Sequence, residues 1–205
     1  MVDYALVARA VLRAERGKAH QAQFRYMKLK QQVNPHFLFN SLNILDCLVC
    51  EQRTEQASAY IHKLAGIFRY MLQDEEGTLV RLREEMAFVG MYVDLLQVRF
   101  PEGFRVETDI SDEAMNRHVL PCSVQLLIEN AIKHNSVGAG RPLVIRIVAV
   151  AEAVTVSNNL QLKVSGNPST RVGLNYIRQQ YLDLSGIPIG IRRTDTEYCV
   201  TLPLL

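Results

Sequence analysis

Apolar residues recur at helical spacing along the first third of the chain. A first set follows the spacing i, i+4, i+7 and i+11: Leu38, Leu42, Leu45 and Val49. After a polar break at Glu51–Thr54, a second set continues in the same way: Ala57, Ile61, Leu64, Phe68 and Met71. Each set forms one stripe along a helix. The pattern therefore predicts a helical hairpin with a short loop.

The two apolar stripes are too extensive for the two helices of one hairpin to cover. Two hairpins packed in parallel, one from each of two chains, would bury both stripes in a four-helix bundle. The sequence therefore predicts a homodimer.

Helical and strand periods alternate beyond the polar connection Asp74–Gly77. We expect helices over residues 83–99 and 122–135, and a third marked by Leu174, Ile177, Tyr181 and Leu184. We expect strands over residues 104–110, 143–150, 153–158, 187–193 and 198–203. This order favours an α+β fold in which helices cover one face of a single sheet. The predicted domains are residues 1–76, the helical hairpin, and residues 77–205.

Composition excludes several classes of protein. The 205 residues fit one large domain or two small ones, and their net charge of +2 is too small to argue for direct nucleic-acid binding. No run of about 18 apolar residues is present. Residues 1–33 hold seven basic and two acidic side chains, a net of +5, so the remainder carries −3.

The basic first segment has two explanations that the sequence leaves open. One is a solvated helix face. The other is a segment just below a membrane, where the positive-inside rule places basic residues ahead of a cytoplasmic domain. In the second case the chain is part of a longer receptor, with a membrane sensor segment upstream. The expected location is then the cytoplasmic face of the cell membrane.

A histidine directly follows a proline inside the first predicted helix, in the segment Asn34–Asn43. Pro35 lacks a backbone donor, and its ring crowds the carbonyl of Gln31 four residues earlier. We therefore expect a bend that leaves His36 accessible. An accessible imidazole has a pKa of about 6.5, so it is mostly neutral near pH 7 and can act as a nucleophile.

The predicted helix over residues 122–135 has two unlike faces. Asn130, Lys133 and His134 lie at i, i+3 and i+4 and share its polar side. An amide, an ammonium and an imidazole together suit a magnesium-bound polyphosphate. The alternative is a solvated face carrying an i, i+4 ion pair between Glu129 and Lys133.

Two segments in this order resemble the motifs of one family. Residues 34–43 resemble the phospho-acceptor box of LytS-type sensor histidine kinases, and residues 126–135 closely resemble the N-box of the Bergerat ATP-binding fold. The resemblance covers about residues 24–203. It implies a helical hairpin followed by a Bergerat-type α/β sandwich with one mixed sheet.

The resemblance also implies a function and its partners. We expect ATP-dependent autophosphorylation of His36, with ATP and Mg²⁺ as cofactors. The phosphoryl group would pass to an aspartate of a response regulator, which is expected to bind DNA. One alternative is a catalytically weak or inactive signalling partner that keeps the dimer and the regulator-docking surface. Another is an ATPase or anti-sigma-type kinase sharing the Bergerat fold.

The family motifs assign roles by position. Asn130 would hold Mg²⁺ against the ATP phosphates, while Lys133 and His134 would contact the phosphates or the ribose side. Glu129 would orient or activate a reacting group. Asn40, one helical turn after His36, would orient its imidazole.

Residues that would contact the nucleotide depart from the family pattern in places. Asn158 stands where an aspartate is expected to accept from the adenine amino group, and an uncharged amide accepts more weakly. Arg171, Gly173 and Leu174 occupy the second glycine box, with Arg171 in place of its first glycine. Leu160 likewise replaces a glycine. Residues 161–171 would form the lid over the nucleotide. These departures motivate the inactive-partner alternative.

Overall fold

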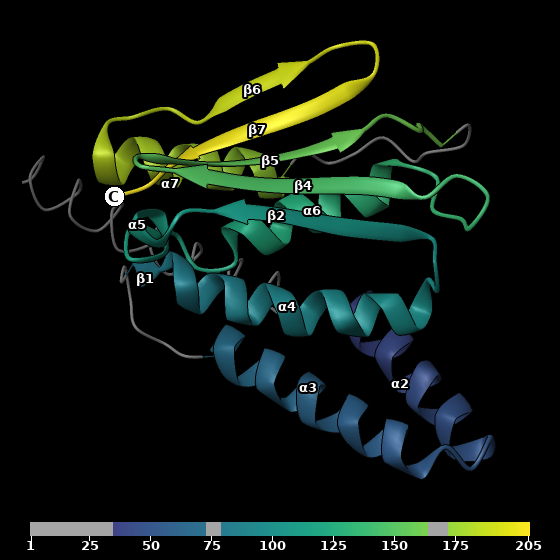
Figure 1. Ribbon diagram of the computed structural model, residues 1–205. Helices are drawn as coiled ribbons and strands as arrows, with labels where there is room; N and C mark the ends of the chain where they lie inside the picture. The colour runs from purple at the N-terminus through teal and green to yellow at the C-terminus, as the bar shows by residue number, and fades with distance from the viewer. Residues whose placement is uncertain (1–34, 73–78, 164–171) are drawn as a thin grey trace, which may run out of the picture. The chain divides into compact units, whose positions relative to one another are not determined.

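The computed structural model describes residues 35–72, 79–163 and 172–205 (Figure 1). The chain divides into two compact units, Met1–Asn43 and Ile44–Leu205. The domain boundary predicted at residues 76 and 77 lies outside the described residues, as do residues 1–33 and most of the predicted lid. Within the described ranges, no helix combines the length and hydropathy that crossing a bilayer requires.

Two helices form where the first apolar stripes predict them. Helix α2 spans Pro35–Cys50 and helix α3 spans Thr54–Leu72. The backbone N–H of Arg53 closes the turn between them by donating to the carbonyl of Leu48 at 2.9 Å. Pro35 opens α2, a position where its missing N–H leaves no helical bond unmade. The bend predicted before His36 lies outside the described residues.

The buried face of α3 is rotated from the predicted stripe. Its buried residues are Ala57, Tyr60, Leu64, Ile67 and Met71. Ile61 was expected in the stripe but is 48% exposed, and Phe68 is only half-buried. The reason is that α3 packs along α4 (Leu82–Arg99) of its own chain (Figure 1). The periodicity predicted the helix correctly, but it could not anticipate this intrachain partner.

One mixed sheet of five strands forms the centre of the second unit. Its order is β2-β4-β5-β7-β6, with β2 parallel to β4 and every other pair antiparallel. The strands span Phe104–Ile110 (β2), Leu143–Val150 (β4), Ala153–Asn159 (β5), Gly190–Arg193 (β6) and Glu197–Pro203 (β7). The short strands β1 (Val80–Arg81) and β3 (His118–Val119) pair separately. The predicted α+β class with one mixed sheet is confirmed.

Helices cover one face of this sheet. Helix α6 (Ser123–His134) packs on β4 and β5, and α7 (Val172–Ser185) packs beside α6 (Figure 1). A further helix, α5, spans Asp112–Met115. Alternate residues of β4 fill the core between helices and sheet: Leu143, Ile145, Ile147 and Ala149. The residues between them face away from these helices, with Val150 65% exposed.

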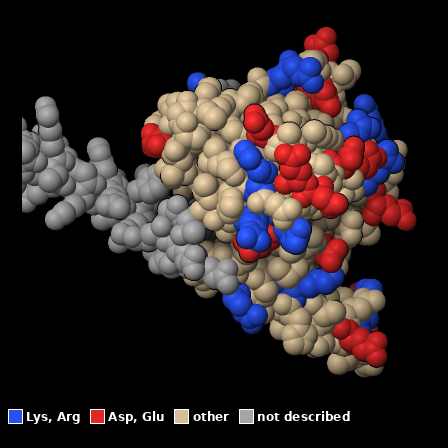
Figure 2. All heavy atoms as spheres, turned by 60° about the vertical axis from the view of Figure 1, so that its left-hand side comes forward, with Lys and Arg blue, Asp and Glu red and all other residues tan. Residues whose placement is uncertain are grey.

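Charged side chains of both signs lie on the face drawn in Figure 2. Figure 2 shows basic and acidic residues interspersed on one face of the molecule, without a large patch of one sign.

Candidate functional site

Four of the predicted site residues belong to α6. Its buried side is apolar: Val124, Leu127, Ile128, Ala131 and Ile132. Glu129, Asn130 and His134 are half-buried, and Lys133 is exposed. The predicted helix with two unlike faces is therefore confirmed, and its polar side presents an amide, an ammonium and an imidazole within two turns.

Glu129 is oriented from within the helix. The side chain of Gln125, one turn earlier and buried, donates from Nε2 to Glu129 Oε2 at 3.1 Å. This bond orients the carboxylate of the residue that precedes Asn130. Within the described ranges, no hydrogen bond holds the Asn130 amide, so its oxygen is available to a ligand.

A lysine caps the end of α6. Lys163 Nζ donates to the carbonyls of Ile132 at 3.2 Å and Lys133 at 3.0 Å, and its backbone N–H donates to His134 at 3.3 Å. The last carbonyls of a helix carry partial negative charge and lack helical partners, so a cation there is stabilising. These hydrogen bonds therefore hold the segment after β5 against the helix that carries Asn130.

Asn135 makes a second link between the end of α6 and the segment after β5. This buried side chain donates from Nδ2 to the carbonyl of Ala131 at 2.8 Å. Its Oδ1 accepts from the backbone N–H of Gln161 at 2.8 Å. The described start of the predicted lid, residues 161–163, is thus held at both ends.

His134 lies in a cationic environment. Burial lowers its pKa from the ordinary value of 6.5, and the charges of Lys133 and Lys163 lower it further. The imidazole is therefore neutral near pH 7, able to donate one hydrogen bond and accept one.

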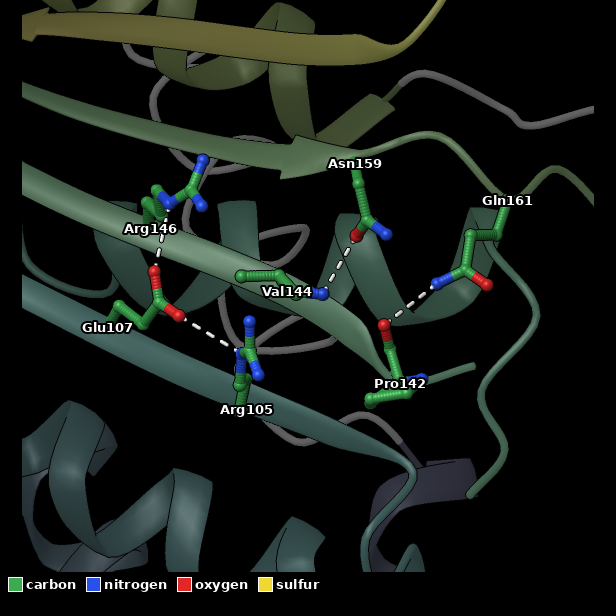
Figure 3. Close-up of polar contacts among 7 residues, drawn as sticks. All are labelled: Arg105, Glu107, Pro142, Val144, Arg146, Asn159 and Gln161. Atoms are coloured by element: carbon green, nitrogen blue, oxygen red, sulfur yellow. Dashed lines mark hydrogen bonds and ion pairs between the residues drawn. The ribbon is translucent and has the colours of Figure 1, made fainter. Parts of the chain in front are cut away.

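Asn158 lies at the end of β5 on the face that the helices cover. Its side chain is 5% exposed, and its Nδ2 donates to the carbonyl of Asn159 at 2.7 Å. That bond uses the amide nitrogen and leaves Oδ1 as the acceptor. The next side chain, Asn159, accepts from the backbone N–H of Val144 at 2.7 Å and so ties β5 to β4 (Figure 3).

The start of α7 approaches α6 closely at a glycine. A Cβ on Gly173 would lie 2.8 Å from Cδ1 of Leu126, closer than packed side chains allow. The packing of the two helices is therefore one reason for glycine here, beside the phosphate contact that the family motif implies. Leu174 follows in the same turn and is half-buried. Arg171 lies outside the described residues.

His36 and Asn40 lie in the first two turns of α2, within the unit Met1–Asn43. Asn40 is half-buried. The backbone of His36 is helical, and its side chain lies outside the described residues.

A shallow pocket of about 250 Å³ lies where β4 and β7 begin and β5 ends. Its lining residues are Val144, Arg146, Ser157, Asn158, Asn159, Thr196 and Glu197. Arg146 pairs with Glu107 at 2.9 Å, and Arg105 meets the same carboxylate at 3.0 Å (Figure 3). The hydrogen bond from Arg146 lowers the pKa of Glu107. The pocket includes no residue of α6, and Asn158 is the one predicted site residue in its lining.

Sequence reasoning missed a residue of α4 that accepts hydrogen bonds from the first backbone N–H groups of α6. Glu85 of α4 is fully buried and accepts from the backbone N–H groups of Cys122, Val124 and Gln125 at 2.8, 3.0 and 3.4 Å. The signal was an acid four residues before Val89, inside the apolar stripe of its helix. The hydrogen bonds made by Gln125, Asn135 and Lys163 had no comparable signal in the sequence.

Comparison with known proteins identifies relatives. The histidine kinase family model matches residues 24–104. The sensor protein LytS of Bacillus cereus is 40% identical over 106 residues, covering 52% of this chain and 18% of the relative. The sensor protein LytS of Staphylococcus haemolyticus is 29% identical over 190 residues, covering 85% of this chain and 32% of the relative. This chain thus spans less than a third of the length of either relative.

Among solved structures, the catalytic domain of histidine kinase ThkA matches with a TM-score of 0.44 at 15% identity. The match covers 62% of this chain and 96% of that one.

Proposed function

We propose that this chain, which is a relative of the LytS-type sensor histidine kinases, is an ATP-dependent protein-histidine kinase of a two-component system. One observation carries the proposal. The chain that matches the histidine kinase family across His36 also presents Asn130, Lys133 and His134 together on one helix. The first part supplies a phosphoryl acceptor, and the second supplies groups that suit a magnesium-bound polyphosphate.

The residues of α6 fit a nucleotide with its metal. The amide oxygen of Asn130 is a suitable ligand for a hard cation and has no competing hydrogen bond among the described residues. Lys133 supplies an exposed ammonium for phosphate oxygens, and neutral His134 supplies a hydrogen bond. Bound Mg²⁺ would neutralise charge on the phosphates.

The remaining predicted contacts surround the nucleotide. Asn158 Oδ1 accepts from the adenine amino group. Gly173 and Leu174 offer backbone N–H groups at the start of α7, where the helix dipole favours an anion. Arg171 adds a positive charge from the lid.

The reaction joins a nitrogen to phosphorus. The neutral imidazole of His36 attacks the γ-phosphorus of ATP, the new N–P bond forms, and the bond to the leaving ADP oxygen breaks. Asn40 orients the imidazole, and Glu129, held by Gln125, orients a reacting group near Asn130. The phosphoryl group then passes to an aspartate of a response regulator, which we expect to bind DNA.

The proposed assembly is a homodimer whose helical hairpins form a four-helix bundle. Val49, Ile61 and Leu72 of α2 and α3 are 60%, 48% and 55% exposed. A second hairpin packed against them would remove this apolar surface from water. We propose that residues 1–76 form this bundle, and that residues 77–205 form the ATP-binding domain. The basic residues 1–33 then lie at the cytoplasmic face of a membrane, below a sensor segment.

The second candidate is a catalytically weak or inactive signalling partner. Asn158, Leu160 and Arg171 depart from the family pattern where the nucleotide would bind. Such a protein would keep the dimer and the regulator-docking surface.

Incubation with Mg²⁺ and γ-labelled ATP tests the proposal. We expect acid-labile, base-stable label on the wild-type chain and none on His36→Ala. Asn130→Ala should lose label because it lacks the magnesium ligand, while His62→Ala, on α3, serves as the control that keeps it. Label that persists in His36→Ala would contradict the proposal. No label on the wild type, with no binding of Mg·ATP at millimolar nucleotide, would favour the inactive partner.

A further inference from the structure

One carboxylate joins three helices of the unit Ile44–Leu205. Glu85 of α4 is fully buried and accepts four hydrogen bonds. Three come from the backbone at the start of α6, as described above. The fourth comes from the hydroxyl of Tyr70 on α3, which lies 2.7 Å from Oε2. The same Oε2 also accepts from the N–H of Cys122.

This carboxylate takes the place of a helix cap. The first N–H groups of a helix have no helical partner, and a side chain at the N-cap normally accepts from them. Cys122 is the N-cap of α6 but makes no such bond, and its backbone is left-handed with φ of 59°. The first turn of α6 therefore depends on a group that belongs to α4.

The partners of Glu85 favour its ionised form. Three of the four are backbone N–H groups, which only donate, so a protonated carboxyl could give its proton only to the Tyr70 oxygen, at the loss of the bond that this hydroxyl now donates. Burial raises the pKa of Glu85, while the hydrogen bonds from Tyr70 and the α6 backbone oppose the rise. The positive end of the α6 dipole adds to this opposition.

Tyr70 is itself fixed by stacking. Its ring lies against Phe88 of α4, with centroids 4.2 Å apart and planes 13° apart. The hydroxyl therefore has a defined position relative to Glu85. A sliding or rotating α3 would lengthen this bond and disturb a carboxylate on which the start of α6 depends.

We infer that the hydrogen bond between Tyr70 and Glu85 fixes the position of α3 relative to the start of α6. The Tyr70 hydroxyl is then a positioning group for nucleotide binding. The inference rests on the proposed function in taking α6 as the nucleotide-binding helix. A short helix moves as a unit, so a displacement of its first turn also moves Asn130. The hairpin helix α3 thereby sets the affinity of α6 for Mg·ATP. Because coupling is reciprocal, bound nucleotide would strengthen the bond between Tyr70 and Glu85.

Tyr70→Phe tests the inference, since it removes the hydroxyl and keeps the stacked ring. Ile67→Val is the matched control, because Ile67 is fully buried on α3 but makes no polar link. We expect Tyr70→Phe to weaken binding of Mg·ATP to the full chain about fivefold by calorimetry, the effect of one lost hydrogen bond. Ile67→Val should leave the affinity within about twofold at a similar loss of thermal stability.

Amide exchange supplies a readout that needs no nucleotide. In Glu85→Gln and in Tyr70→Phe, the amide of Cys122 should exchange faster relative to the amides of β4, and in Ile67→Val it should not. In Glu85→Gln the amides of Val124 and Gln125 should follow. If Glu85→Gln fails to fold, Tyr70→Phe carries this measurement alone.

The outcomes separate the two proposals. Equal affinities in Tyr70→Phe and Ile67→Val, or unchanged exchange at Cys122, would overturn the positioning role. A wild-type chain that binds no Mg·ATP would overturn the proposed function and with it the effect on affinity. The exchange measurement would still decide whether Tyr70 and Glu85 hold the start of α6.

Discussion

At the scale of single residues, the predicted polar side of α6 gains its character from neighbours distant in sequence. His134 owes part of its lowered pKa to Lys163, which follows it by 29 positions and reaches back to the end of its helix. The sequence places Asn130, Lys133 and His134 together through helical spacing alone. It does not show which charges or carbonyls surround them, because the loop after β5 brings those groups to the site.

The pKa of His134 provides a test at this scale. In Lys163→Gln, the pKa of His134 should rise because one nearby positive charge is lost. It should stay below 6.5, since burial is the largest cause of the shift. Nuclear magnetic resonance titration of the imidazole measures this, with Lys63→Gln on α3 as control. An unchanged pKa in Lys163→Gln would show that the lysine does not act on His134.

The same shift has a consequence for stability. The folded chain binds the His134 proton more weakly than the unfolded chain does. The contribution of His134 to the free energy of unfolding is therefore present above pH 6.5 and is lost as the pH falls through the lowered pKa.

At the scale of elements, hydrophobic periodicity predicted strand positions well. The bounds of β2 and β4 match the prediction residue for residue. In β4 every second residue is buried, and in β2 the sequence itself alternates with period two. Strand β6 begins at Gly190 instead of Ile187. It lies at the sheet edge with every residue exposed, so no buried face imposed a pattern on it.

The turn between β4 and β5 gives a prediction at this scale. The sequence indicates a tight turn at Ala151 and Glu152, but only the structure shows that Ala151 has φ of 48°. Glycine relieves the strain of a left-handed alanine, so Ala151→Gly should raise the free energy of unfolding by about 0.5–1 kcal/mol. Chemical denaturation measures the change.

Ala149→Gly is the matched control for that turn. This alanine is buried inside β4, where glycine should lower the stability by about 1 kcal/mol. A loss of stability in both variants would contradict the strain assigned to Ala151.

At the scale of the whole molecule, the resemblance to LytS-type sensor histidine kinases is confirmed by the comparisons. Two motifs, residues 34–43 and residues 126–135, sufficed for it. The dimer, the domain boundary and the assignment of site residues stay predictions. The exposed apolar residues of α2 and α3 support the dimer.

Light scattering of two matched variants tests the dimer. Ile61 on α3 and Ile191 on β6 are both 48% exposed. We expect a dimeric mass for the wild type at micromolar concentration and a shift towards the monomer in Ile61→Asp, because a buried charge in the bundle is costly. Ile191→Asp should remain dimeric. A monomeric wild type, or equal effects of the two substitutions, would count against the proposed bundle.

The sequence by itself determined the long helices, four strands of the main sheet and the polar side of α6, because these follow from periodicity within single elements. The short elements β1, α5 and β3 and the start of β6 carry no such period. The tertiary structure alone decided which face of α3 is buried, since α4 rather than a second chain covers it. It also decided that the first N–H groups of α6 donate to the carboxylate of Glu85 and that its last carbonyls accept from Lys163. Both are contacts between residues far apart in the chain, and such contacts leave no periodic signal.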